Sequence, residues 1–367
     1  MRAVIISQEY LDPARRGKLR ALAGLGCAVT VATPGGESGI DGGVRLAPVP
    51  ARGDATDASR RVWSRRALTA LLRDVRPDIV QIEAEPGTQA AAAATRAAVS
   101  LHLPTIAFSW ESLARPWSFF ERRRRRTTLG AAQGIIGGNR LAVGLLRTEA
   151  PAARHAVIPQ FGLSLPAAAT HTERPGLAIG FIGRLVPERG AELLFRACNQ
   201  VMGAWTLAVL GTGPEQESLE LLAQRLGLSA RLRWLGGAGR SQIEQFWQDI
   251  DVLAVPSRAT QDWVEQFSPL LIEAMAHGVT AVVTDTGALP EIVSDAGMIV
   301  SDPESMALAF QHLLADPAMR QRLGEAGRRR VLAHYADTPI AEQTLAFWHE
   351  VLASSGRQSQ SPDGVVA

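Results

Sequence analysis

The chain has 367 residues, 46% hydrophobic and 20% charged, with a formal net charge of +2. It is too long for one ordinary core, so we expect two domains of a water-soluble protein. It has no run of 18 uncharged apolar residues, its start, MRAVIISQEYL, lacks a signal-peptide layout, and only Cys27 and Cys198 occur. These features predict a cytoplasmic protein without a membrane span, a disulfide framework or a zinc site.

In the first half of the chain, runs rich in β-branched residues alternate with segments of helical spacing. The predicted strands are 2–7, 27–33, 78–83, 105–110 and 134–139. The predicted helices are 14–26, 64–75, 88–99 and 119–130. Strands separated by helices in this way are typical of a parallel, doubly wound sheet.

The same pattern restarts after a segment rich in Pro, Ala and Thr (166–175). The predicted strands are 177–183, 205–211, 232–236, 251–257 and 280–285, and the predicted helices include 192–201, 222–227 and 269–278. The amphipathic segment 339–353 predicts a last helix, and the polar residues after it predict a disordered tail. We therefore expect domains at 1–168 and 169–336, a helix at 337–353 and a tail at 354–367.

The loop GFIGRLVPERG (180–190) follows a predicted strand. Gly183 permits close approach of the backbone, and Arg184 and Arg189 add two positive charges, which together suit a phosphate group. On these residues alone, a solvated loop with two arginines stays open as an alternative. GTGP (211–214) also follows a strand, but a single G-x-G pattern is more often a tight turn.

The stretch WVEQFSPLLIEAMAHG (263–278) carries Glu265 and Glu273 on either side of a predicted helix start. Ser268 suits an N-cap and Pro269 suits the first helical position. The amides of Leu270 and Leu271 would then point out of the helix start and, with the helix dipole, form an anion site. An anion between two carboxylates indicates a ligand with hydroxyls on both sides of its phosphates, such as a nucleotide-sugar.

Together these motifs resemble a bacterial branch of family 4 of the retaining glycosyltransferases, and the resemblance covers nearly the whole chain. In the second half it rests on GRLVPERG (183–190), VLGTGPEQESLELLAQRLGL (209–228), DVLAVPSR (251–258), EQFSPLLIEAMAHG (265–278) and TGALPEIV (286–293). In the first half it rests on EYLDPARRGKLRALA (9–23), IEAEP (82–86), FSWESL (108–113) and VIPQFG (157–162).

The resemblance implies an α/β protein of the GT-B fold: two doubly wound, Rossmann-like parallel-sheet domains facing a cleft, with the C-terminal helix crossing back to the first domain. The first domain would bind the acceptor and the second the donor. In the Glu-x7-Glu signature, Glu265 would contact the donor sugar and Glu273 the ribose. The diphosphate would meet Arg184 and Arg189, and the implied catalytic residues are Arg184, Arg189 and Glu265. The implied donor-binding residues are Gly17, Gly183, Arg184, Arg189, Glu265, Phe267, Ser268, Pro269, Leu270, Leu271 and Glu273.

The acceptor is expected to meet Arg16, Lys18, Trp110 and Glu111. The chain departs from the family pattern at several positions. A lysine is usual at Arg189, glycine is usual at Ser268, and many members have a histidine where this chain has Trp110 and Glu111. A residue with an N–H is usual at Pro269, so the proline removes one possible phosphate donor.

The implied reaction transfers a sugar, a hexose, from a nucleotide-sugar to an acceptor hydroxyl with retention at the anomeric carbon. A GT-B nucleotide-sugar epimerase and a non-catalytic GT-B protein that binds a nucleotide-sugar stay open as alternatives. We expect no cofactor, no metal and no nucleic-acid partner. Asp249 and Asp251 match the D-x-D motif of metal-dependent glycosyltransferases. The end of a helix followed by a buried strand explains the two aspartates better than a metal site does.

Charge is unevenly distributed along the chain. Residues 1–165 carry 23 Lys and Arg against 13 Asp and Glu, and the remainder carries 15 against 23. The basic half indicates an anionic partner, although attraction to the acidic half is the alternative. In 115–130, Trp117, Phe119 and Phe120 precede the five arginines of 122–126. This pattern predicts contact with the inner face of an anionic membrane and a lipid-linked or anionic acceptor. The alternative is a helix with aromatic residues in the core and solvated arginines.

Overall fold

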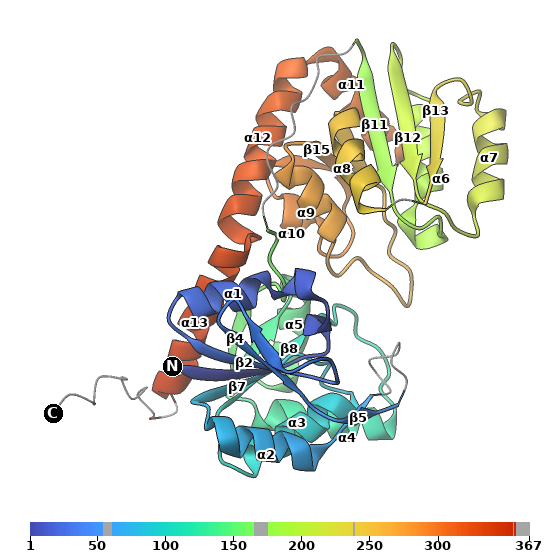
Figure 1. Ribbon diagram of the computed structural model, residues 1–367. Coiled ribbons are helices and arrows are strands. Elements are labelled where there is room, and N and C mark those ends of the chain that lie inside the picture. The colour runs from blue at the N-terminus through green and yellow to red at the C-terminus, as the bar shows by residue number, and fades with distance from the viewer. Residues whose placement is uncertain (54–60, 165–174, 238, 355, 357–367) are drawn as a thin grey trace. The chain divides into compact units, whose positions relative to one another are not determined.

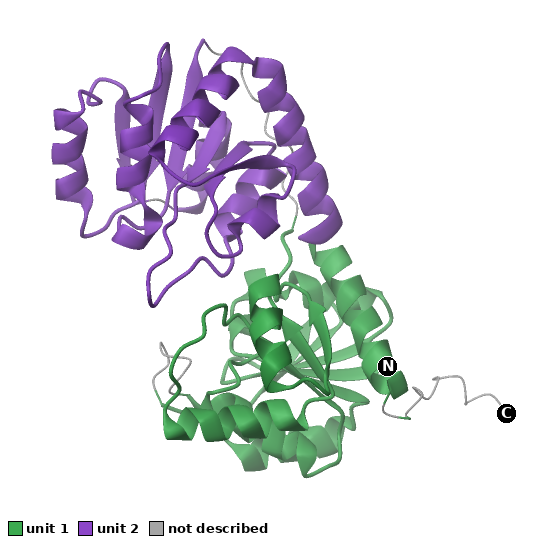
Figure 2. Cartoon of the chain, turned by 180° about the vertical axis from the view of Figure 1, so that it is seen from behind, with its two compact units in different colours: residues 1–164, 336–367 green, residues 165–335 purple. Residues whose placement is uncertain are grey.

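The computed structural model describes residues 1–53, 61–164, 175–237, 239–354 and 356. The chain divides into two compact units, unit 1 with residues 1–164 and 336–367 and unit 2 with residues 165–335 (Figure 2). The predicted domain limit at 168 and most of the predicted tail at 354–367 lie outside the described residues.

One eight-stranded sheet forms the centre of unit 1, in the order β10-β9-β8-β7-β1-β2-β4-β3 (Figure 1). Its strands are β1 (Arg2–Ile6), β2 (Ala28–Thr33), β3 (Gly39–Asp41), β4 (Val44–Pro48), β7 (Ile79–Ile82), β8 (Thr105–Ser109), β9 (Gly134–Gly137) and β10 (Arg154–Val157). A separate short antiparallel pair joins β5 (Ala51–Arg52) to β6 (Val62–Trp63).

The predicted parallel, doubly wound sheet is confirmed, and it has one antiparallel edge strand, because β3 pairs with β4 in the antiparallel direction. A two-residue turn joins these strands, and both of its residues, Gly42 and Gly43, have positive φ angles of 56° and 85°. Tight hairpins favour glycine at such positions because other residues are strained there. The sequence analysis assigned no element to this part of the chain.

The helices of unit 1 are α1 (Gly17–Gly24), α2 (Arg65–Val75), α3 (Gln89–Val99), α4 (Phe119–Ala131), α5 (Arg140–Glu149) and α13 (Asp337–Ser354). The predicted helix 14–26 begins as a 3-10 turn over Pro13–Arg16 and becomes α-helical only at Gly17. α5 and β10 were not predicted. The other predicted helices of this half agree with the structure to within about two residues.

Alternation along β1 explains why helices cover both faces of this sheet. Ala3 and Ile5 belong to a core that includes helix α1 and the C-terminal helix α13, whereas Val4 and Ile6 belong to a core that includes α2 and α3. Successive side chains of a strand point to opposite faces, so an uninterrupted apolar strand requires cover on both.

The last helix, α13, is part of unit 1 and packs against α1. Trp348 of α13 is fully buried, and its Nε1–H donates to Oε1 of Gln81 on β7 at 2.7 Å. A Cβ atom on Gly134 of β9 would lie 2.7 Å from Cγ2 of Val351, so α13 needs glycine there to lie this close to the sheet. The predicted return of the C-terminal helix to the first domain is confirmed.

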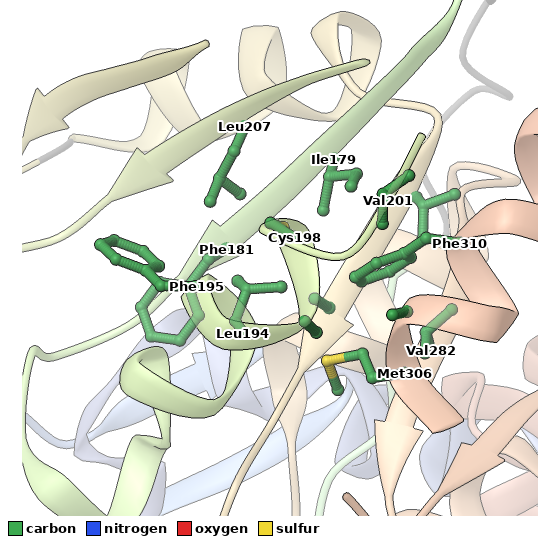
Figure 3. Close-up of a cluster of buried hydrophobic side chains, with 14 of the residues drawn as sticks. Ile179, Phe181, Leu194, Phe195, Cys198, Val201, Leu207, Val282, Met306 and Phe310 are labelled. Carbon is green, nitrogen blue, oxygen red and sulfur yellow. The ribbon is translucent and has the colours of Figure 1, made fainter. Parts of the chain in front are cut away.

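Unit 2 contains a six-stranded parallel sheet in the order β13-β12-β11-β14-β15-β16. Its strands are β11 (Leu177–Ile182), β12 (Trp205–Leu210), β13 (Leu232–Gly236), β14 (Val252–Val255), β15 (Thr280–Thr284) and β16 (Gly297–Val300). Its helices are α6 (Ala191–Cys198), α7 (Gln216–Arg225), α8 (Arg240–Asp249), α9 (Pro269–Ala276), α10 (Leu289–Val293), α11 (Pro303–Ala315) and α12 (Pro317–His334). Phe195 and Phe310 are fully buried in the core between β11, α6 and α11 (Figure 3).

We expect Trp348→Ala to lower the free energy of unfolding by about 3–5 kcal/mol, because it leaves a large cavity and an unpaired Gln81 amide oxygen. Urea unfolding followed by circular dichroism measures this loss. Glu350→Ala, an exposed position of the same helix, is the control and should change stability little. Equal stability of both variants would show that α13 is not needed for the fold of unit 1.

Candidate functional site

A pocket of about 300 Å³ opens in unit 2 at the carboxyl ends of β11 and β14. These neighbouring parallel strands mark the point where the strand order reverses, because the chain runs from β11 outward to β13 and then returns to β14 on the other side. In open parallel sheets such a reversal leaves a crevice outside the strand ends, where ligands commonly bind. The fold therefore supplies the position of this pocket.

The lining of this pocket contains every donor-binding residue predicted in unit 2 except Glu273. These residues are Gly183, Arg184, Arg189, Glu265, Phe267, Ser268, Pro269, Leu270 and Leu271. Arg184 is exposed, and none of the described residues forms an ion pair or hydrogen bond with its guanidinium. Its charge is thus available to a ligand in the pocket.

Glu265 is buried, and two side chains hold its carboxylate. Arg189 forms an ion pair with Oε2, and the Ser257 hydroxyl donates to the same oxygen at 3.1 Å. Burial raises the pKa of the Glu265 carboxyl, and the charge of Arg189 opposes this rise. Arg189 also lies over the ring of Trp263, 5.4 Å from its centre, so its position is fixed from two sides.

A tight turn holds the backbone of Glu265. Gly287 has a φ of 59°, and a Cβ atom there would lie 2.1 Å from the Glu265 carbonyl oxygen. The same oxygen accepts the N–H of Ala288 at 2.7 Å. Only glycine permits this approach, so the TGALPEIV motif (286–293) positions Glu265, although helix α9 separates the two in the sequence.

The first turn of α9 borders the pocket, since Leu270 and Leu271 line it, and the first N–H groups of a helix have no partner within the helix. Pro269 occupies the first helical position, as predicted. The expected capping by the Ser268 side chain is wrong, because its hydroxyl makes no capping hydrogen bond and the residue has a φ of −123° and a ψ of 88°. The hydroxyl is therefore not used by the helix.

Glu273 points away from the pocket lining toward α8. Its Oε1 accepts the Trp247 Nε1–H at 3.1 Å, and Arg240 approaches both carboxylate oxygens at 3.2 and 3.3 Å. Glu273 is buried, whereas the Arg240 side chain is 64% exposed. A ligand hydroxyl that reaches Glu273 would therefore share the carboxylate with Arg240 or displace it.

In unit 1, a protein carboxylate lies at the start of α1, beside Gly17, which was expected to bind the donor. A Cβ atom on Gly17 would lie 2.0 Å from Oδ2 of Asp337, and Ser164 donates to the same oxygen at 2.9 Å. Burial raises the pKa of Asp337. Gly17 is thus required for the contact between α1 and α13, which gives it a packing role that the sequence did not indicate.

Two predicted acceptor residues in this region have intramolecular partners. The Lys18 side chain is 1% exposed and its Nζ lies 2.7 Å from Oε1 of the equally buried Glu83. This burial contradicts the expectation that Lys18 touches an acceptor. Arg16 donates to the carbonyl oxygens of Tyr10 and Leu11 and to Asp41, and its side chain is mostly buried.

The other two predicted acceptor residues follow β8. Trp110 donates through Nε1 to Oε1 of Gln160 at 2.9 Å and packs on Gly138. Glu111 forms an ion pair with the buried Arg125, and Arg115 lies 3.7 Å from its other oxygen. Both side chains are partly exposed, so both remain accessible at the carboxyl end of the sheet.

Some site residues were not predicted. Ser257 and Trp263 hold Glu265 and Arg189, and both lie within motifs that the analysis had noted for other reasons. Asp251 accepts the backbone N–H of Ala178 at 2.8 Å, which supports a structural role for the D-x-D pattern. In the described ranges, no group of three or more His, Cys, Asp or Glu side chains is arranged to hold a metal, and no helix is long and apolar enough to cross a membrane.

Comparison with known families gives two matches. Residues 18–161 match the model described as Glycosyltransferase Family 4, and residues 171–330 match Glycosyl transferases group 1. D-inositol 3-phosphate glycosyltransferase of Corynebacterium jeikeium is 30% identical over 200 residues, 51% of this chain and 46% of the relative. A GDP-mannose-dependent alpha-(1-6)-phosphatidylinositol monomannoside mannosyltransferase of Mycolicibacterium smegmatis is 32% identical over 164 residues, 42% of this chain and 43% of the relative. These matches span about half the length of the curated relatives.

Among solved structures, the chain is similar to sucrose-phosphate synthase from Thermosynechococcus elongatus. The TM-score is 0.69 at 19% identity, and the match covers 96% of this chain and all of that one. At this identity the likeness concerns the fold, and it confirms the predicted GT-B architecture.

We expect Arg189→Met to destabilise the protein by about 1–3 kcal/mol near pH 8, because it leaves the Glu265 carboxylate buried without a cation. In this variant the pKa of the Glu265 carboxyl in the folded protein lies further above its unfolded value of about 4.3. The carboxyl therefore takes up a proton as the pH falls toward about 5, and the loss of stability should shrink. Thermal unfolding across this range measures the change. Arg184→Met, which removes an exposed arginine of the same loop, is the matched control. Adding Glu265→Gln to Arg189→Met should restore stability, and failure to do so would reject this account of the pair.

Proposed function

Because the chain carries a family 4 glycosyltransferase domain and a group 1 glycosyl transferase domain within a GT-B fold, we propose that it transfers a sugar from a nucleotide-sugar to an acceptor hydroxyl. The donor binds in the pocket of unit 2, and the configuration at the anomeric carbon is retained. One observation carries the proposal: the pocket brings two arginines, a buried carboxylate and the start of a helix to one reversal point of the sheet.

Each part of this pocket suits one part of a nucleotide-sugar. Arg184, Arg189 and the amides at the start of α9 suit the diphosphate, on which negative charge grows as the glycosyl bond breaks. Glu265 suits the hydroxyls of the donor sugar. Glu273 suits the ribose once Arg240 gives way or shares the carboxylate. The carboxylate of the lining, Glu265, is held by Arg189 and Ser257 and is not free to attack, so retention would follow from attack on the face that the leaving group departs from.

The name of the mycolicibacterial relative includes dependence on GDP-mannose, which supports a nucleotide-sugar as donor here. A metal-independent reaction in the cytoplasm is part of the proposal. An epimerase would change the sugar without releasing a nucleoside diphosphate, and a non-catalytic binding protein would release none. Incubation with a panel of sugar nucleotides, followed by measurement of nucleoside diphosphate release and by identification of the sugar that stays on the nucleotide, separates the three functions.

We expect Glu273→Ala to weaken binding of the free nucleoside diphosphate by about 1–3 kcal/mol, the range for a hydrogen bond to a charged group. Glu265→Ala should instead reduce turnover of the intact donor more than it reduces diphosphate binding. Calorimetry and steady-state kinetics measure the two effects. Glu217→Ala, an exposed carboxylate on α7, is the control. Equal loss of binding and turnover in both variants would reject this division of roles.

The outer face of α4 supports an acceptor at a membrane surface. Phe119 and Phe120 are 66% and 65% exposed, and Arg122, Arg123 and Arg126 are exposed beside them. The alternative that these two aromatic residues are core is therefore wrong. Arg125 differs from its neighbours because it is buried, with Trp117 4.1 Å from its guanidinium carbon. Exposed aromatic rings beside solvated arginines suit the interface of an anionic bilayer.

Vesicles containing anionic lipid should bind the protein at low salt and release it as salt rises, since screening weakens exposed charges. The triple variant Arg123→Gln, Arg124→Gln, Arg126→Gln should lose most of this binding in a co-sedimentation assay. The control changes the same charge on exposed positions of α2, with Arg65→Gln, Arg66→Gln and Arg73→Gln. Equal loss in both triple variants would indicate a net-charge effect, and no binding at low salt would reject membrane contact through α4.

A further inference from the structure

A second group of carboxylates lies in unit 1, outside the pocket of unit 2. Glu85 follows β7 and Glu111 follows β8, and these strands pair in parallel. Because the carboxyl ends of parallel strands meet at one edge of a sheet, the two side chains lie close together. Their segments, IEAEP and FSWESL, belong to the motifs that carry the family resemblance.

Three groups near the end of β8 fix the Glu85 carboxylate. The Ser109 hydroxyl donates to Oε2 at 2.5 Å, and the Trp110 backbone N–H donates to Oε1 at 2.8 Å. The Glu111 N–H in turn donates to the Ser109 hydroxyl oxygen at 3.1 Å. Each carboxylate oxygen keeps a free lone pair, and the residue is partly exposed, so a ligand hydroxyl can reach it.

The cations around this edge already have partners. Arg125 forms an ion pair with Glu111 and two hydrogen bonds to Glu149, at 2.9 and 2.5 Å. Arg115 lies 3.3 Å from Glu121 and 3.7 Å from Glu111. Across the described ranges, no Lys, Arg or His forms an ion pair with Glu85. A phosphate placed here would meet carboxylates without a free cation, whereas a hydroxyl would meet a strong acceptor.

Resting on the proposed function, we propose that Glu85 accepts a hydrogen bond from the acceptor hydroxyl, and that the acceptor presents an uncharged sugar or polyol ring to this edge. A phosphate or lipid anchor of the acceptor would then bind elsewhere. Glu85 is a binding and orienting group: the hydroxyl oxygen bonds to the anomeric carbon as the bond to the diphosphate breaks, and the departing phosphate oxygen takes the hydroxyl proton.

Because Glu85 titrates, its proposed role predicts a dependence of acceptor use on pH. Burial and the neighbouring charge of Glu111 raise its pKa to about 7, while the bonds from Ser109 and Trp110 and the charge of Arg125 oppose the rise. The charged groups that act on it are Glu111 and Arg125; Arg115 and Glu149 act on Glu111, and Arg115 also pairs with Glu121. Because only the ionised carboxylate accepts freely on both oxygens, acceptor use should increase as the pH rises through about 7.

The first test measures binding of myo-inositol, methyl hexosides and a hexose 6-phosphate to the full chain by saturation-transfer NMR. We expect at least one uncharged polyol to bind, and Glu85→Gln to weaken it roughly 10- to 100-fold, the value of a hydrogen bond to a charged group. Asp74→Asn, in an exposed ion pair with Arg45, is the control in the same unit. Binding of the phosphorylated hexose alone, or polyol binding that Glu85→Gln leaves unchanged, would overturn the inference, as would no polyol binding by the wild type.

The second test compares nucleoside diphosphate release with and without a polyol that binds. Glu85→Gln should keep the acceptor-independent release and lose the acceptor-dependent part together with its rise near pH 7. Ser109→Ala removes a bond that lowers the Glu85 pKa, so it should shift the midpoint of this rise to higher pH while the protein stays folded. A midpoint unmoved by both variants would contradict the role of Glu85. If no sugar nucleotide is turned over while polyol binding still depends on Glu85, the proposed function fails and the polyol site stands.

Discussion

The constraint on which both units depend is the reversal of strand order in a parallel sheet that helices cover on both faces. Such a sheet leaves polar groups little room except at its strand ends, and the reversal point opens a crevice there. In unit 2 the reversal lies between β11 and β14, and a pocket occupies it. In unit 1 it lies between β1 and β7. The two reversal points differ: a pocket lies at that of unit 2, and buried polar side chains lie at that of unit 1.

In unit 1 the protein fills the reversal point with its own side chains. The Glu83 carboxylate accepts from Lys18 at 2.7 Å, from Gln81 at 2.7 Å and from Gln160 at 3.0 Å. A buried ion pair is tolerated when further hydrogen bonds satisfy its remaining atoms, as they do here. Gln81 also accepts from Trp348 of α13, and so the network connects the C-terminal helix to the centre of the sheet.

Hydrophobic spacing and capping residues along the sequence predicted those strands and helices that depend mainly on their own residues. The strands with uninterrupted apolar runs, such as β1 and β15, and the helices with clear N-caps, such as α2, followed from spacing alone. The short strands β3 and β4 did not, because β3 has no buried residue and the two buried residues of β4 are three positions apart, which is not the period of a strand. The pocket of unit 2 was predictable because its residues come from two motifs that each follow a strand, and the topology joins them.

Distant partners explain what the sequence did not reveal. Lys18 lies in a basic stretch that reads as solvated, yet its partner Glu83 is 65 positions away. The same holds for Gly17, whose neighbour Asp337 comes from the last helix. The helix start alone placed Leu270 and Leu271 at the pocket that they line, whereas the orientation of Glu273 depends on Trp247 and Arg240 of another helix.

Three buried or partly buried carboxylates show how the surroundings decide what a glutamate can do. Glu265 has a cation, Arg189, against it, so its charge is balanced before any ligand arrives. Glu273 has an exposed cation, Arg240, that solvent can draw away, so its oxygens are open to exchange. Glu85 has a hydroxyl and an amide as its hydrogen-bond donors and no ion pair among the described residues, and burial together with the charge of Glu111 raises its pKa to about 7. The residue type is the same in each case. What differs is the paired cation, which is fixed at Glu265, movable at Glu273 and missing at Glu85. Glu265 can therefore orient a ligand, Glu273 can exchange partners and Glu85 can titrate.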